Sequence, residues 1–201
     1  MKLSRTGKEM KLAQSTMLMA NHRENIEEAI AGDIIGIYDT GNYQIGDTLS
    51  TRKETLFFEP LPTFPPELFA LVTPKDTMKA KQFQKGVSQL AQEGAIQVYR
   101  NEYNEVIIGA VGQLQFEVFQ YRLENEYNAK IRMDRLEFSL ARWVHAEDFD
   151  TVKKILDSRT MLVFDHFDRP LILFANQFTL NYFAEKNPDI KLLEALDVKQ
   201  F

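Results

Sequence analysis

The stretch that decides the fold is Leu90-Ala91-Gln92-Glu93-Gly94-Ala95-Ile96-Gln97-Val98-Tyr99-Arg100, which holds the end of a helix, a glycine and the start of a strand. The residues before it place apolar side chains at helical spacing: Ala80, Phe83, Val87 and Leu90. We therefore expect a helix from about residue 78 to 92, capped by Thr77. Gly94 stands where helices commonly end, because glycine adopts the left-handed conformation without strain. Residues 96–99 alternate as a strand does, so the stretch indicates an α+β fold.

The neighbouring segments complete a unit of four strands and two helices. We expect strands at 68–72, 96–99, 106–110 and 130–133. A second helix is expected at 113–127, where Leu114, Val118 and Tyr121 form the apolar stripe that should face the sheet. The order β-α-β-β-α-β is that of a ferredoxin-like unit.

The last sixty residues repeat this rhythm. The expected strands are 140–144, 162–164, 171–174 and 190–193, and the expected helices are 147–156 and 176–186. No linker separates the two repeats. We therefore expect two packed ferredoxin-like βαββαβ halves, at about 67–136 and 137–201.

The region before these halves reads differently. Four of the seven prolines fall within residues 59–66, and proline is excluded from helix interiors and central strands. This stretch is interpreted as a linker between a C-terminal α+β domain, 67–201, and an N-terminal domain, 1–58. Short strands at 33–38, from Gly46 and at 56–58 predict a partial β-barrel with a thin core.

Composition excludes several classes of protein. The net charge is −5, so any contact with RNA must come from a local basic face rather than from the overall field. The chain has no cysteine, which removes disulfides, thiolate metal sites and cysteine nucleophiles and fits a reducing cytosol. No segment approaches the roughly 18 to 20 apolar residues of a membrane span.

A phosphate-binding loop is also absent from the sequence. It requires a glycine, four residues and then Gly-Lys-Ser/Thr before a helix. The sole Gly-Lys pair is Gly7-Lys8, but Glu9 follows it and Lys2 stands in the place of the first glycine. This segment is interpreted as a hairpin turn.

The histidines give no motif for a catalytic or metal site. His22, His145 and His166 are far apart, and none has the helical i, i+4 partner of a zinc hydrolase. The polar turn Asp165-His166-Phe167-Asp168 leaves an unrelated α+β enzyme open as an alternative. We assign no catalytic, cofactor-binding or metal-ligating residue, and we expect a binding module rather than an enzyme.

Two groups of basic residues are candidates for contact with RNA or with an acidic protein. The first group lies around the helix at 78–92, and the second lies near the N-terminus. They consist of Lys75, Lys79, Lys81 and Lys85, and of Arg5, Lys8 and Lys11. Their alternative role is that of ordinary solvated lysines and arginines.

Several stretches resemble one family. Residues 31–37 and 45–49, with their paired Gly-Asp turns, resemble the second-domain barrel of translational GTPases. Residues 90–100 and 109–118 resemble the third domain of elongation factor G and its relatives. Residues 124–129 and 141–144 are most similar to the bacterial class II release factors, and the resemblance runs from about residue 5 to 189.

The resemblance implies a function. Class II release factors use GTP to remove class I release factors from the ribosome after peptide release. It implies a cytoplasmic chain whose partners are the ribosome, particularly small-subunit RNA and protein, and indirectly the class I factors. GTP and Mg²⁺ would belong to the GTPase domain of the full-length family, for which this sequence has no matching residues, so we expect a non-catalytic C-terminal portion. Another translational GTPase, such as elongation factor G or a ribosomal protection protein, and an unrelated interaction scaffold remain alternatives.

Overall fold

The chain forms two compact units, residues 1–61 and 62–201. The computed structural model describes residues 1–12, 15–19, 22–26, 28–38, 42–43, 45–58 and 65–194. Most of the expected linker, 59–66, lies outside these residues, so the linker and the domain boundaries drawn from it stay predictions. The expected turn at 39–42 also lies largely outside them.

The first unit consists of short strands. They are β1 (Lys2–Leu3), β2 (Ser15–Met19), β3 (His22–Ile26), β4 (Ile35–Ile37) and β5 (Leu49–Ser50). β1 pairs with β5, and β2 lies between β3 and β4. The expected strands near 33–38 and after Gly46 are confirmed in shorter form, whereas the β2–β3 hairpin was missed. The strand expected at 56–58 is wrong, because these residues adopt no regular structure and leave Phe57 and Phe58 exposed.

The first half of the second unit has the ferredoxin-like arrangement. Its elements are β6 (Leu68–Pro74), α1 (Ala80–Gln92), β7 (Gln97–Asn101), β8 (Val106–Ala110), α2 (Gln113–Glu126) and β9 (Ile131–Leu136). The strands are all antiparallel, in the order β7-β8-β6-β9. The predicted β-α-β-β-α-β unit is confirmed.

The second half repeats this topology. Its elements are β10 (Leu140–Val144), α3 (Phe149–Ile155), β11 (Thr160–Phe164), β12 (Pro170–Phe174), α4 (Gln177–Lys186) and β13 (Leu192–Leu193), in the sheet order β13-β10-β12-β11. The edge strands β7 and β11 pair through Arg100 with Phe164 and Asn101 with Val163. The two halves thus share one eight-stranded sheet.

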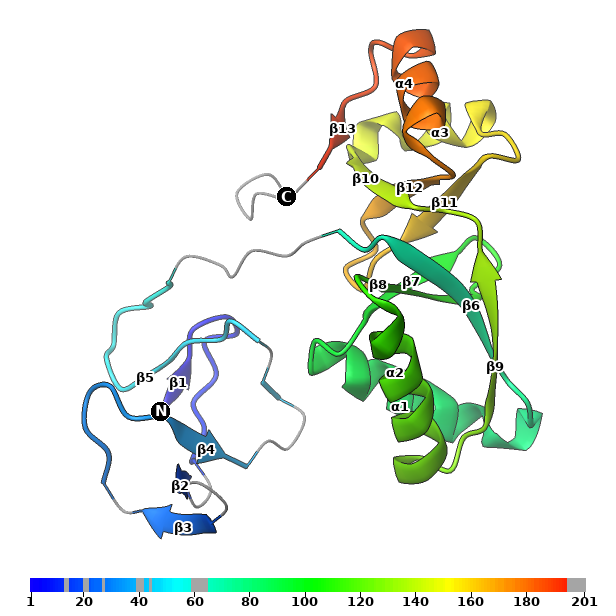
Figure 1. Ribbon diagram of the computed structural model, residues 1–201. Helices are drawn as coiled ribbons and strands as arrows, with labels where there is room; N and C mark the ends of the chain where they lie inside the picture. The colour runs from blue at the N-terminus through cyan, green and yellow to red at the C-terminus, as the bar shows by residue number, and fades with distance from the viewer. Residues whose placement is uncertain are drawn as a thin grey trace. The chain divides into compact units, whose positions relative to one another are not determined.

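The strands of the second unit are apolar on both faces. Alternate residues of β12 point to different clusters: Ile172 and Phe174 lie beneath α4, whereas Leu171 and Leu173 join Trp143 in a central cluster. The central cluster draws on both halves and lies between the two helical layers, which occupy opposite ends of the unit (Figure 1). Burial on both faces explains why central strands read as continuous apolar runs.

The N-terminus of α1 corrects one expectation. A 3₁₀ turn, Thr77–Lys79, precedes the helix, and the capping residue is Asp76 rather than Thr77. The Asp76 carboxylate accepts a hydrogen bond from the backbone N–H of Met78 at 2.9 Å. The expected stop is confirmed, since Gly94 has φ +71° and its N–H donates to Ala91 O at 3.0 Å.

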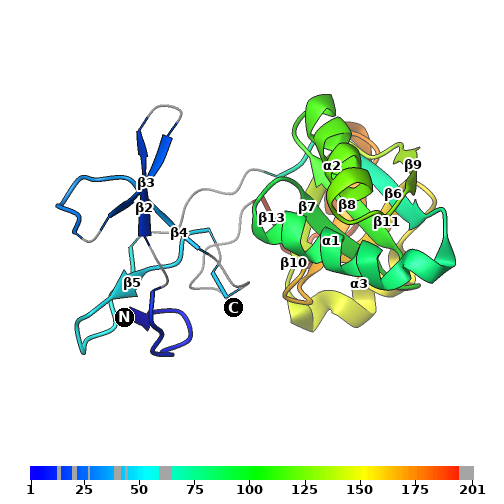
Figure 2. The ribbon, with the colours of Figure 1, turned by 90° about the horizontal axis from the view of Figure 1, so that it is seen from below.

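The apolar face of α2 is a second correction. Its buried residues are Phe116, Phe119 and Leu123, whereas the expected stripe of Leu114, Val118 and Tyr121 is exposed. The reason lies in α1, beside which α2 runs (Figure 2). A Cβ at Gly86 would lie 2.5 Å from Leu123 Cδ2, so the helices approach closely only with Leu123 turned inward.

Candidate nucleic-acid interface

The first basic group surrounds the start of α1. Lys75 follows β6, Lys79 lies in the 3₁₀ turn, and Lys81 and Lys85 are one turn apart on the helix. Lys75, Lys81 and Lys85 are exposed, and Lys79 is half-buried. None of the four forms an ion pair with a carboxylate of the described residues. Their charges are therefore available to an external anion.

A fifth cation belongs to the same region and was missed from the sequence. The backbone N–H of Lys75 donates to Lys130 O at 2.9 Å, because β6 and β9 pair up to Pro74 and Ile131. Lys130 is exposed. The signal that could have found it is strand pairing, which brings the residue before the last strand of a half beside the residue after its first strand. We call Lys75, Lys79, Lys81, Lys85 and Lys130 the lysine surface.

The second basic group is not a free cluster. Arg5 forms two hydrogen bonds with the Asp47 carboxylate, at 2.7 and 2.8 Å, and a third with Asn42 O at 3.1 Å. The hydrogen bond to Asp47 raises the pKa of Arg5. Arg5 therefore ties the first turn to the turn at 45–46, while Lys8 and Lys11 remain exposed.

The Gly7-Lys8 segment is a turn, as expected. Gly7 has φ +70°, a value that favours glycine. The N–H of Leu3 donates to Lys8 O at 3.0 Å across the returning chain.

The turn between β11 and β12 is held by its own acidic residue. Asp165 is buried and accepts hydrogen bonds from the backbone N–H of Phe167 at 2.9 Å and of Arg169 at 3.0 Å. Its second oxygen accepts from Arg169 Nε at 2.7 Å. This arrangement stabilises a tight turn and leaves the Asp165 carboxylate engaged within it.

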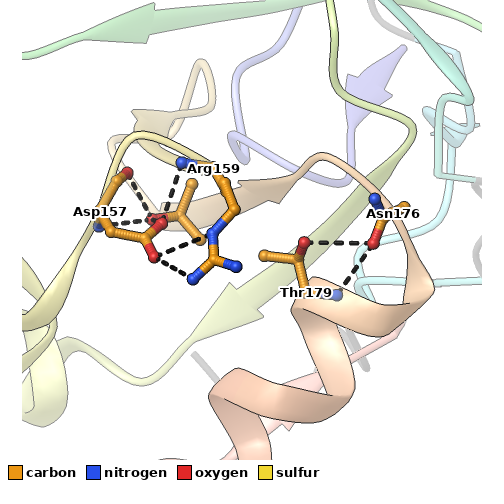
Figure 3. A network of polar contacts seen from close by, with 5 residues as sticks. Asp157, Arg159, Asn176 and Thr179 are labelled. Atoms are coloured by element: carbon orange, nitrogen blue, oxygen red, sulfur yellow. Dashed lines mark hydrogen bonds and ion pairs between the residues drawn. The ribbon is translucent and has the colours of Figure 1, made fainter.

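A shallow pocket lies beside α4, between the helix and the loop before β11, and its wall includes Asp157, Thr160, Thr179 and Tyr182. Figure 3 shows that its polar groups serve local structure. Thr179 Oγ1 bonds to Asn176 Oδ1 at 3.1 Å at the helix cap. Thr160 Oγ1 donates to Asp157 O at 3.0 Å, and the Asp157 carboxylate pairs with Arg159 at 2.8 Å.

Two further searches cover the part of the chain that the structure describes. Within it, no group of three or more histidine, aspartate or glutamate side chains is placed to hold a metal ion. No helix there has the length and apolar character needed to cross a membrane.

Comparison with known families accounts for both units. Residues 1–52 match the family described as "Elongation factor G domain 2", and residues 58–184 match "Class II release factor RF3, C-terminal domain". Both descriptions concern translation factors, so the chain falls within that class. The second match covers more than half of the chain. The chain belongs to the class II release factor family.

Individual relatives agree. "Peptide chain release factor 3" of Listeria monocytogenes serotype 4a (strain HCC23) is 57% identical over 195 residues, or 96% of this chain and 37% of that protein. The protein of the same name from Enterococcus faecalis is 56% identical over 94% of this chain and 36% of its own length. The chain thus spans little more than a third of these relatives. A crystal structure of a Thermus thermophilus protein, titled only by the label ttk003000868, matches with a TM-score of 0.49 and 16% identity, over 66% of this chain and 22% of that one.

Proposed function

We propose that this chain is the ribosome-binding C-terminal portion of a translation termination factor whose full-length form uses GTP to release class I release factors from the ribosome. The observation that carries the proposal is the 57% identity across 96% of the chain to a protein named for peptide chain release. GTP and Mg²⁺ would act in another part of the full-length protein. The site of action would be the cytoplasm, where ribosomes work.

The division of labour is that this chain binds and does not hydrolyse. The engaged carboxylate of Asp165 and the engaged hydroxyls beside α4 support this view. Calorimetric titration of the chain with GTP should give no binding heat. Micromolar affinity would contradict the assignment of GTP to another domain.

The lysine surface is the proposed contact with small-subunit ribosomal RNA. Exposed ammonium groups without carboxylate partners displace counterions from phosphates, which makes binding strongly salt-dependent. The net charge of −5 means that this attraction is local. Binding should therefore depend on particular lysines rather than on total charge.

Co-sedimentation with ribosomes and with isolated small subunits, over a series of salt concentrations, tests this dependence. Replacing Lys75, Lys79, Lys81 and Lys85 by Ala should lower the salt slope by about 3 and weaken low-salt binding at least about tenfold. The control replaces four other exposed lysines, Lys53, Lys154, Lys186 and Lys191, and so changes the net charge equally. Unchanged sedimentation of the folded first variant, or equal losses in both, would rule out the lysine surface.

A further inference from the structure

The outward face of α2 carries an apolar row that nothing in the second unit covers. Leu114 is 69% exposed, Val118 43% and Tyr121 67%, and Val111 just before the helix is 52% exposed. Their spacing of three and four residues places them on one side of the helix. We call these four residues the outer stripe of α2. Contiguous apolar patches rimmed by polar groups mark interaction sites in soluble proteins.

The outer stripe cannot be buried by rotation of the helix. The inner face is already filled by Phe116, Phe119 and Leu123, each at most 1% exposed. Gly86 of α1 leaves no room for another arrangement, since even a Cβ there would lie 2.5 Å from Leu123 Cδ2 and 2.8 Å from Tyr127 Cγ. The helix is thus fixed with a second apolar face outward, which is a prepared surface rather than a displaced core.

Further restraint on α2 comes from an ion pair. Arg122 bridges Glu126 on its own helix, at 2.8 Å, and Glu93 just after α1. The guanidinium of Arg122 is therefore neutralised by two carboxylates and adds no positive charge to the surface.

The border of the outer stripe is acidic. Glu117 is exposed and lies three residues from Leu114 and four from Tyr121, so it adjoins both on the helix surface. Glu124 lies three residues beyond Tyr121 and accepts only a neutral hydrogen bond from Gln120, at 3.1 Å, among the bonds described. With the surplus carboxylate of the Arg122 group, the border carries net negative charge on both sides.

We propose that the outer stripe of α2 docks a cationic protein segment, one that presents apolar side chains to Leu114, Val118 and Tyr121 and lysine or arginine to the border. The negative border repels an RNA backbone. It also disfavours a second copy of this chain, because symmetric pairing would bring Glu117 and Glu124 against the same residues. Charge complementarity selects a basic partner, and the apolar row supplies the area that is buried.

The test uses a fluorescently labelled synthetic helical peptide as probe, with leucines at i, i+3, i+4 and i+7 and lysines and arginines elsewhere. Binding to the intact chain is followed by anisotropy. Replacing Leu114, Val118 and Tyr121 by Ser should weaken binding at least about tenfold, since these residues supply the apolar contact. Glu117→Gln with Glu124→Gln should weaken it severalfold and flatten its salt dependence.

The matched control lies on the outer side of α1. Ser88→Ala with Gln92→Ala changes exposed residues of the neighbouring helix and should leave peptide affinity unchanged. The single variant Leu114→Ala guards against misfolding of the triple variant, and circular dichroism checks both. A scrambled peptide of the same composition should bind more weakly than the amphipathic one.

Three results would overturn the proposal. They are equal peptide affinity in the triple variant and the wild-type chain, loss of binding to a single-stranded RNA oligonucleotide in the triple variant, and self-association of the wild-type chain that the triple variant abolishes. The proposal does not rest on the ribosomal function, because the probe is a peptide. Failure here leaves the lysine-surface test standing, and the converse holds.

Discussion

Two leucines of the same helix provide a direct test of which face of α2 is the core. Leu123 is fully buried, whereas Leu114 is 69% exposed. Leu123→Ala removes buried methyl groups and leaves a cavity against Gly86, at a cost of about 3 kcal/mol. Leu114→Ala loses at most a third of that burial, and the higher helix propensity of alanine offsets part of it, which leaves about 0.5 kcal/mol or less.

Urea unfolding followed by the fluorescence of Trp143 measures this difference. Trp143 is the only tryptophan and lies in the central cluster of the second unit, so its emission reports on that unit. With a denaturant slope of about 2 kcal/mol per molar urea, the midpoint should fall by about 1.5 M for Leu123→Ala. It should fall by about 0.2 M for Leu114→Ala. Equal shifts, or a larger shift for Leu114→Ala, would refute the assignment of the two faces.

Three other substitutions test single features. Gly86→Ala should destabilise the chain by about 1 to 2 kcal/mol in urea, because overpacking against Leu123 outweighs the helix propensity of alanine; the exposed control Ser88→Ala should not, and a stabilised Gly86→Ala would contradict the close approach. Asp76→Ala should cost about 1 kcal/mol through loss of the cap, while Asp76→Asn retains most of it, so equal thermal midpoints for the two would argue against capping. Burial raises the pKa of Tyr99 well above its usual value. Both states are therefore protonated below about pH 10, and stability falls above it as the unfolded chain ionises. Absorbance of tyrosinate should show Tyr99 ionising only on unfolding, and identical native titrations of the wild-type chain and Tyr99→Phe would support this, whereas an extra native ionisation in the wild type would contradict it.

The fold of the second unit could be predicted because its local signals agree. Residues 106–110 and 171–174 are short apolar runs, the helices carry apolar residues at helical spacing, and Gly94 marks a stop. The repeated order then indicates two similar halves. Their joining through β7 and β11 is a long-range pairing that no local pattern contains.

The orientation of α2 could not be read from the sequence for a physical reason. Apolar residues occur on both sides of this helix, so periodicity identifies a helix without identifying its inner face. The choice is made by Gly86, about thirty residues earlier, which admits Leu123 and not Leu114. The candidate site shows the same limit: Arg5 reads as a free cation until Asp47 is placed beside it, and Lys130 joins the lysine surface only through the pairing of β6 with β9.

The pairing of β7 with β11 has a consequence for aggregation. Each ferredoxin-like half alone would expose one of these strands along an open sheet edge, and such edges recruit strands from other molecules. The outermost strands of the joined sheet are better protected: β13 has two residues, and β9 carries Arg132, Asp134 and Arg135. Cleavage between the halves, within residues 137–139, would uncover two inner edges and turn each half into a template for fibril-like assembly.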